Sequence, residues 1–125
     1  MNILLTAIGK RVQLISFLKK SFNIIGVDCS SNNPAKHFVD AFFEVPSYQD
    51  EKYVDTLLKI CNDKKINVLI PLFEREYLLL DSRRKEFHDI GVHLLLSNYL
   101  VLNICEDKFK TYEFFLEHDI KSPKT

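Results

Sequence analysis

Short apolar runs alternate with longer amphipathic stretches along this chain, and this alternation constrains the fold more than any other feature. The apolar runs occupy residues 2–7, 23–28, 41–46, 67–72 and 92–97. They lack the polar alternation of a strand that faces water on one side, so the pattern predicts strands covered on both faces. The amphipathic stretches predict helices at 10–20, 50–65, 74–90, 98–105 and 107–119.

This order of elements predicts an α/β fold. We expect a three-layer, Rossmann-like parallel sheet of about five strands with helices on both faces. At 125 residues the chain has the length of one domain with its own core. Local signals support the helices: Asp50 is a good N-cap, Pro34 suits the start of a helical turn, and Gly91 is a natural C-terminal cap for the helix at 74–90.

Composition argues against several classes of partner. Seventeen basic residues balance seventeen acidic ones, so we expect neither nucleic acid nor an anionic membrane surface as a partner. No apolar run is long enough to predict a membrane-spanning helix, and the first run lacks the preceding charge of a signal peptide. The three cysteines, Cys29, Cys61 and Cys105, form no CxxC pair, which predicts reduced thiols and a cytoplasmic location.

Ligands of open α/β sheets bind beyond the carboxyl ends of the strands, where the strand order reverses. That rule selects the stretches that follow the five predicted strands: "TAIGKR", "DCSSNNP", "PSYQD", "PLFERE" and "SNYL". The P-loop pattern GxxxxGK[ST] and the zinc pattern HExxH are absent, and the first strand lacks the acids of a phosphoacceptor domain.

The stretch "TAIGKRV" carries one glycine where a dinucleotide loop has three. Ala7 and Val12 stand where the other two glycines of GxGxxG belong, although Asp28 ends the second strand roughly where a ribose-binding acid is found. Lys10 and Arg11 oppose a helix dipole unless an anion lies opposite them. These residues alone are compatible with three interpretations: a degraded dinucleotide loop, another anion-binding loop or a solvated turn.

Two further stretches have both a plain and a functional interpretation. Glu74 and Glu76 suit the first turn of a helix, and a carboxylate there can also contact a substrate amine or a ribose. In "DKFKTYEFF", Asp107 is a candidate N-cap, and Lys108 by itself is an ordinary solvated lysine.

Five stretches together carry a family resemblance: "NILLTAIGKRVQLISFLK", "IIGVDCSSNNPAKHFVDAFFEVP", "INVLIPLFEREYLLL", "GVHLLLSNYLVLNICEDKFKTYEFF" and "HDIKSPKT". In this order the chain resembles the N-terminal, pre-ATP-grasp domain of ATP-grasp enzymes, in particular the short proteins similar to the carbamoyl-phosphate synthase large subunit. That group usually has T-x-x-G-R-R-V in the first stretch, from which Lys10 departs conservatively.

The resemblance implies the N-terminal part of the substrate and nucleotide cleft of a ligase. Such enzymes use ATP and Mg²⁺ to activate a carboxylate as an acyl phosphate, which an amine or another nucleophile then attacks. By resemblance, Lys108 contacts the nucleotide phosphates. The same comparison suggests a substrate or anion loop at these positions: Gly9, Lys10, Arg11, Asp28, Ser30 and Glu74.

The same resemblance implies a domain at 1–106, and a helix and tail at 107–125 that lead to ATP-grasp domains outside this sequence. We therefore expect a piece of a longer ligase with no catalytic residue or metal site of its own, inactive as an isolated chain. The expected partners are those ATP-grasp domains and a small carboxylate, and a homo-oligomer stays open. A stand-alone Rossmann-like nucleotide-binding or sensor module is the alternative, and a purely structural interaction domain is a third possibility.

Overall fold

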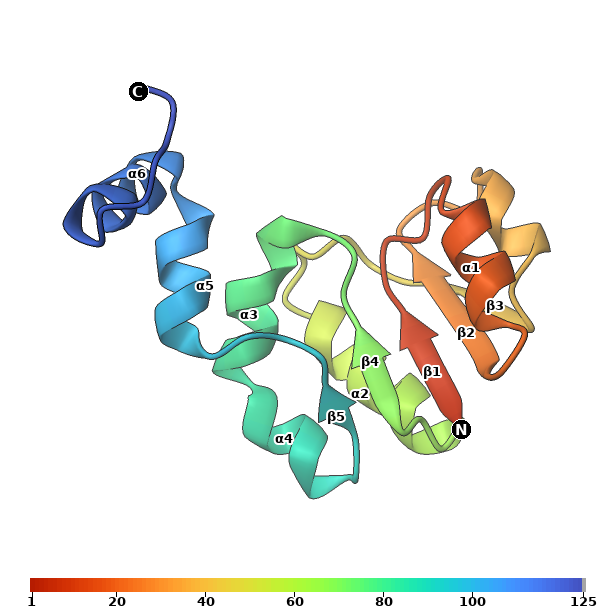
Figure 1. Cartoon of the computed structure of the whole chain (residues 1–125). Helices are drawn as coiled ribbons and strands as arrows, with labels where there is room; N and C mark the ends of the chain where they lie inside the picture. The colour runs from red at the N-terminus through yellow and green to blue at the C-terminus, as the bar shows by residue number, and fades with distance from the viewer. Residues whose placement is uncertain (125) are drawn as a thin grey trace.

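A single parallel sheet organises the computed structural model, which describes residues 1–124 (Figure 1). Its strand order is β3-β2-β1-β4-β5, and all neighbouring pairs are parallel. The strands are β1 (Asn2–Leu5), β2 (Asn23–Asp28), β3 (Ala41–Glu44), β4 (Val68–Ile70) and β5 (His93–Leu94). The predicted α/β sheet of five parallel strands is confirmed.

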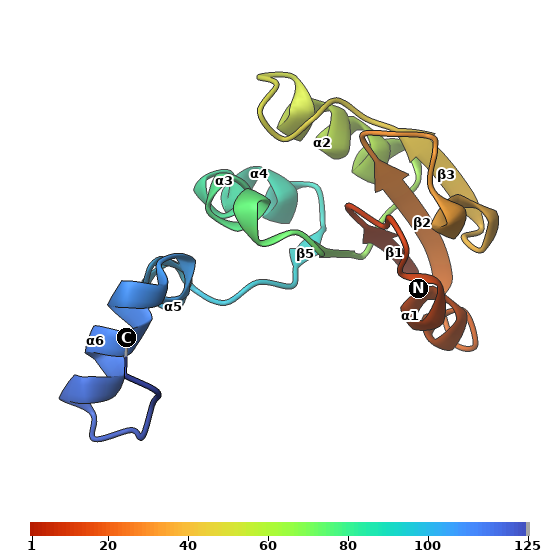
Figure 2. The same cartoon turned by 90° about the horizontal axis from the view of Figure 1, so that it is seen from above.

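Helices connect the strands and cover the sheet. They are α1 (Val12–Leu18), α2 (Tyr53–Asp63), α3 (Tyr77–Ser82), α4 (Arg84–Asp89), α5 (Tyr99–Glu106) and α6 (Lys108–Glu117), with short 3₁₀ turns η1 (Pro34–His37) and η2 (Glu74–Glu76). In Figure 2, α1 lies on one side of the sheet, and α2, α3 and α4 lie on the other. The predicted helices on both faces are therefore confirmed.

Strand β1 shows why uniformly apolar runs form this sheet. Its alternate residues Ile3 and Leu5 pack into the cluster that includes Ile15 of α1, and the residue between them, Leu4, packs into the cluster that includes Leu57 of α2. All five side chains are buried. Both faces of the strand thus contribute to the hydrophobic core, which is the physical reason that the polar alternation is missing.

The last two helices lie away from the sheet in both views (Figures 1 and 2). Helix α5 contacts α3 and α6, whereas α6 buries none of its side chains. Large apolar side chains of this helical pair remain exposed, among them Leu100, Phe109 and Leu116.

The predicted helix at 74–90 is wrong as a single element. The chain forms η2, α3 and α4 there, and Arg83 leaves the helical conformation with φ −118° and ψ 19°. Arg83 makes ion pairs with Asp55 of α2 and with Glu86, which hold the bend against the neighbouring helix. The apolar pattern did not reveal the break because Leu80 and Phe87 keep helical spacing across it.

Other local signals lie close to their predicted places. Gly91 adopts a left-handed conformation, with φ +82°, just after α4. The side chain of Asp50 accepts a hydrogen bond from the backbone N–H of Lys52, but α2 itself begins at Tyr53. The strands are shorter than the apolar runs, because residues beyond the ladder enter the loops.

In the part of the chain that the structure describes, no helix is both long and apolar enough to cross a bilayer. All three cysteines lie in this part and are unpaired: Cys61 is buried, whereas Cys29 and Cys105 are exposed. Burial raises the pKa of the Cys61 thiol to about 12 and keeps it protonated at neutral pH.

The packing of α2 can be tested with Leu57→Ala. Leu57 is completely buried, so the truncation leaves a cavity and should lower the free energy of unfolding by about 2–5 kcal/mol in urea denaturation. Leu100→Ala is the matched control, since Leu100 is 70% exposed, and should change it by less than about 0.5 kcal/mol. Equal effects of the two substitutions would contradict the described core.

Candidate functional site

A small pocket opens at the carboxyl ends of the strands. Strand β1 pairs with β2 on one side and with β4 on the other, so the strand order reverses at this place. Loops that leave the two neighbouring strands diverge there and leave room for a ligand. The pocket has a volume of about 140 Å³ and is lined by Ala7, Asp28, Cys29, Val45, Pro46, Ser47, Tyr48, Tyr53, Phe73 and Glu76.

Asp28 joins the loops after β1 and β2. One carboxylate oxygen accepts the backbone N–H of Gly9 at 3.0 Å, and the other accepts the backbone N–H of Ser30 at 3.1 Å. Gly9 has φ +44°, a conformation that glycine adopts without a steric penalty. The structure therefore brings together three predicted site residues, with the N–H of Gly9 directed at a carboxylate of the chain itself.

Glu76 forms the buried side of the same pocket. It is only 1% exposed, and its two carboxyl oxygens accept hydrogen bonds from the hydroxyls of Thr6 and Tyr53. The Thr6 oxygen in turn accepts the backbone N–H of Leu72 at 3.3 Å. These contacts connect the end of β1, the start of α2 and the segment after β4.

The surroundings of Glu76 shift the proton equilibria of this group and of its neighbour. Burial raises the pKa of Glu76, and the negative charge of Asp28 raises it further, against the opposing effect of the two hydroxyl donors. Burial and the adjacent Glu76 carboxylate raise the pKa of Tyr53, so its phenol stays protonated and donates to Glu76.

Glu74, another predicted site residue, lies in an adjacent hollow. This hollow has a volume of about 500 Å³ and is lined by Tyr48, Glu74, Arg75, Tyr77, Leu78, Leu102, Cys105 and Glu106. Tyr48 lines both spaces, so the pocket at Asp28 and the hollow at Glu74 are neighbours on the same end of the sheet.

The predicted cations lie outside both spaces. Lys10 and Arg11 are exposed, and a guanidinium nitrogen of Arg11 lies 3.4 Å from the backbone oxygen of Leu72. Lys108 is exposed at the first position of α6, where the Asp107 side chain caps the helix through the N–H of Phe109. The structure does not bring Lys108 against the other predicted residues, but it directly follows the segment that contributes Glu106 to the hollow.

Sequence reasoning missed the part of the site formed by Thr6, Tyr53 and Glu76. The sequence interpretation of Glu76, as an acid that suits a helix start or contacts a substrate, includes neither its burial nor its contacts with Thr6 and Tyr53. A signal was present: Glu76 lies four residues before Leu80 and eleven before Phe87, which places it on the apolar side of the predicted helix. An acid in such a position is buried and needs partners.

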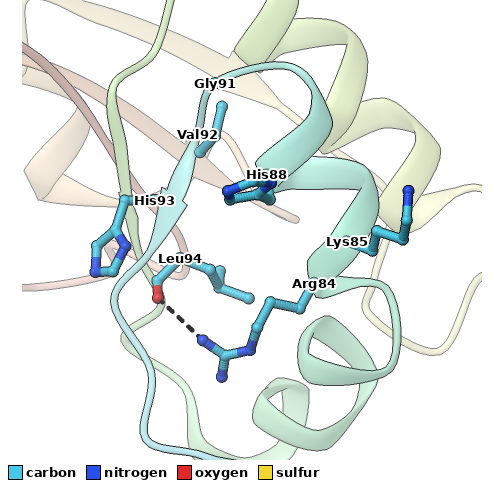
Figure 3. A pocket seen from close by; sticks show the side chains of 7 residues that line it. All are labelled: Arg84, Lys85, His88, Gly91, Val92, His93 and Leu94. Carbon is cyan, nitrogen blue, oxygen red and sulfur yellow. Dashed lines mark hydrogen bonds between the residues drawn. The ribbon is translucent and has the colours of Figure 1, made fainter.

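A larger hollow lies elsewhere, between α4 and the edge strand β5 (Figure 3). It measures about 630 Å³, and the Arg84 guanidinium at its rim donates to the backbone oxygen of Leu94 and pairs with Asp81. It lies away from the loops at the strand reversal and includes none of the predicted site residues. Within residues 1–124, no group of three His, Cys, Asp or Glu side chains is placed to hold a metal ion.

A family model described as the PylC-like N-terminal domain matches residues 3–95. The chain belongs to this family. The match covers all five strands except Asn2, and it includes each strand end that surrounds the pocket. A search of curated protein sequences gives no significant match.

Solved structures with the same fold are ATP-grasp enzymes. The N5-carboxyaminoimidazole ribonucleotide synthetase of Thermotoga maritima is 21% identical, with a TM-score of 0.69 over 98% of this chain and 32% of that enzyme. The L-amino acid ligase of Bacillus licheniformis is 15% identical, with a TM-score of 0.66 over 98% of this chain and 31% of that enzyme. The N5-carboxyaminoimidazole synthetase of Staphylococcus aureus, in complex with ADP, is 16% identical. Its TM-score is 0.65 over 93% of this chain and 29% of that enzyme.

These comparisons confirm the predicted pre-ATP-grasp domain and its fold. The chain spans about a third of the length of these three enzymes. The PylC-like N-terminal domain, rather than the carbamoyl-phosphate synthase group, is the family that the sequence match supports.

The buried carboxyl group gives a pH prediction. Because the pKa of Glu76 is raised above its ordinary value of 4.5, its protonated form contributes stability that is complete below that value. This contribution is lost as the pH rises through the raised pKa. We therefore expect the free energy of unfolding, measured in urea at a series of pH values, to fall more steeply with increasing pH in the wild type than in Glu76→Gln.

Glu74→Gln serves as the control, because Glu74 is exposed, and it should follow the wild-type curve. Parallel curves for the wild type and Glu76→Gln would contradict the described environment of Glu76.

Proposed function

We propose that this chain forms the substrate side of the active-site cleft of an ATP-grasp ligase. The observation that carries the proposal is the pocket at the strand reversal, where Asp28 and Glu76 are held in place by hydrogen bonds from the chain itself. Membership of the PylC-like N-terminal domain family supports it. The fold shared with a carboxyaminoimidazole ribonucleotide synthetase and an L-amino acid ligase supports it as well.

In the proposed reaction, a substrate carboxylate oxygen attacks the terminal phosphorus of ATP, and ADP leaves. The resulting acyl phosphate is attacked at its carbonyl carbon by an amine or another nucleophile, and inorganic phosphate leaves. Mg²⁺ supplies neutralisation of the charge that develops on the phosphate oxygens. ATP and Mg²⁺ are assigned to ATP-grasp domains of the same polypeptide, so we expect residues 1–125 alone to be inactive.

The proposal gives each predicted residue a role. The exposed charges of Lys10 and Arg11, next to Gly9, attract a substrate carboxylate or phosphate. Asp28 and Glu74 face the substrate from the two neighbouring spaces that they line. Ser30 orients Asp28 through its backbone N–H, and Lys108 reaches the nucleotide phosphates. Residues 1–106 form the substrate-side domain, and 107–125 lead toward the nucleotide site.

Two finer assignments belong to the same proposal. A carbamoyl-phosphate synthase-like parent is the specific ligase class suggested by the five sequence stretches. A cytoplasmic location agrees with the three unpaired cysteines, since reducing compartments keep thiols free.

Lys108→Ala, introduced into the full-length polypeptide, tests the nucleotide role. Loss of a charged hydrogen bond to phosphate costs about 1.5–3 kcal/mol, so the KM for ATP should rise about 10- to 100-fold in an assay of ADP release. Lys110→Ala is the matched control on the same helix, because the Lys110 ammonium contacts Asn103 instead. Unchanged ATP kinetics in Lys108→Ala would remove Lys108 from the site.

Arg11→Ala tests the anion loop in the same assay. We expect the KM for the carboxylate or phosphate-bearing substrate to rise about tenfold, with a smaller change in the KM for ATP, because the loop lies on the substrate side. Lys20→Ala, beyond the other end of α1, should leave both values near the wild type. An equal rise of both KM values in Arg11→Ala would refute the assignment.

A further inference from the structure

The pocket at Asp28 and Glu76 has an unusual charge balance. Two carboxyl groups line it, and its lining contains no lysine, arginine or histidine. The exposed cations of the neighbouring loop do not enter it: neither Lys10 nor Arg11 lines the pocket, and the Arg11 guanidinium lies beside the backbone oxygen of Leu72. The chain therefore supplies no countercharge inside this space.

The two carboxyl groups come from different elements and converge on one cavity. Asp28 ends β2, and Glu76 precedes α3 on the other side of β1. Each of their four oxygens accepts one hydrogen bond from the chain, from Gly9, Ser30, Thr6 or Tyr53. A carboxylate oxygen has two lone pairs, so each group retains acceptor capacity for a ligand. These internal donors fix the orientation of the carboxyl groups before any ligand arrives.

Aromatic side chains form other parts of the lining. Tyr48 and Phe73 pack edge to face, with ring centroids 5.4 Å apart and an interplanar angle of 75°. Tyr53 adds a third ring beside Glu76. A cation is attracted to the face of such rings, whereas an anion is not.

We propose that this pocket binds the primary ammonium group of a small amine or amino acid. The proposal rests on the proposed function, because it names the chemistry of the substrate handled at that site. The volume of about 140 Å³ corresponds to about five water-sized groups, which suits an ammonium on a short alkyl arm.

Other ligand classes fit the pocket less well. A carboxylate or phosphate meets the Asp28 carboxylate and the acceptor oxygens of Glu76 without a countercharge, which is unfavourable in a partly buried space. A divalent metal ion requires several anionic or imidazole ligands, and among residues 1–124 no group of three His, Cys, Asp or Glu side chains is placed to hold one. A neutral alcohol gains hydrogen bonds but does not offset the negative charge.

The test is an NMR titration of the 125-residue chain with n-propylammonium, propionate and 1-propanol. We expect n-propylammonium alone to shift the backbone amide signals of pocket residues, such as Cys29 and Tyr48, in a saturable manner. Saturable shifts at the same residues with propionate instead would overturn the proposal, as would equal binding of all three probes. Absence of saturable binding for n-propylammonium would also overturn it.

Variants connect the binding to the named side chains. Asp28→Asn removes one charge and should weaken n-propylammonium binding about tenfold. Glu51→Gln, which changes an exposed acid outside the pocket, should leave the binding unchanged.

Phe73→Leu tests the aromatic wall, because it removes one ring from the lining. The Phe73 side chain is 37% exposed, so this variant remains informative even if Asp28→Asn unfolds. It should weaken binding about threefold. Wild-type affinity in folded Asp28→Asn or in Phe73→Leu would contradict the proposal.

Failure of the ammonium proposal can be distinguished from failure of the proposed ligase function. If n-propylammonium does not bind but the full-length polypeptide releases ADP in response to a carboxylate, only the ammonium assignment fails. If the ammonium binds and no carboxylate or amine elicits ADP release, the proposed ligase function fails and the binding pocket stands.

Discussion

The hydrogen bonds that Glu76 accepts from Thr6 and Tyr53 hold the loops at the carboxyl end of the sheet together. A buried carboxyl group without donors is strongly destabilising, so its partners must stay in place for the fold to tolerate it. The partners come from the end of β1 and the start of α2, and Glu76 itself follows β4. One side chain thereby fixes the relative positions of three segments around the pocket.

Asp28 performs the corresponding task on the other side of β1. Its carboxylate holds the left-handed turn at Gly9 and the loop that begins at Ser30 through their backbone N–H groups. The two carboxyl groups thus order the loops and also determine the charge of the cavity between them. In the proposed ammonium site, the atoms that order the loops are therefore also the atoms that contact the ligand.

The distribution of charge and apolar surface agrees with a domain that works beside others. Acidic groups line the inner pocket, while Lys10 and Arg11 remain exposed at its outer loop. The helices α5 and α6 extend from the sheet with Leu100, Phe109 and Leu116 exposed. The chain covers about a third of enzymes with the same fold, in which further domains complete the molecule.

The sequence by itself determined the sheet and the helices on both faces, because apolar periodicity is a local property that burial on both faces imposes on each strand. The resemblance of five sequence stretches indicated the pre-ATP-grasp domain. The sequence also placed Gly9 after the first strand and Asp28 at the end of the second. The two residues come into contact because these strands are parallel neighbours in the sheet. The sequence did not reveal the bend at Arg83 or the role of Glu76. Thr6 and Glu76 are 70 residues apart, and they meet only because β1 pairs with β4 in one register. Only the tertiary structure decided which hydroxyl groups serve the buried acid Glu76, since such partners are brought together by packing between distant segments.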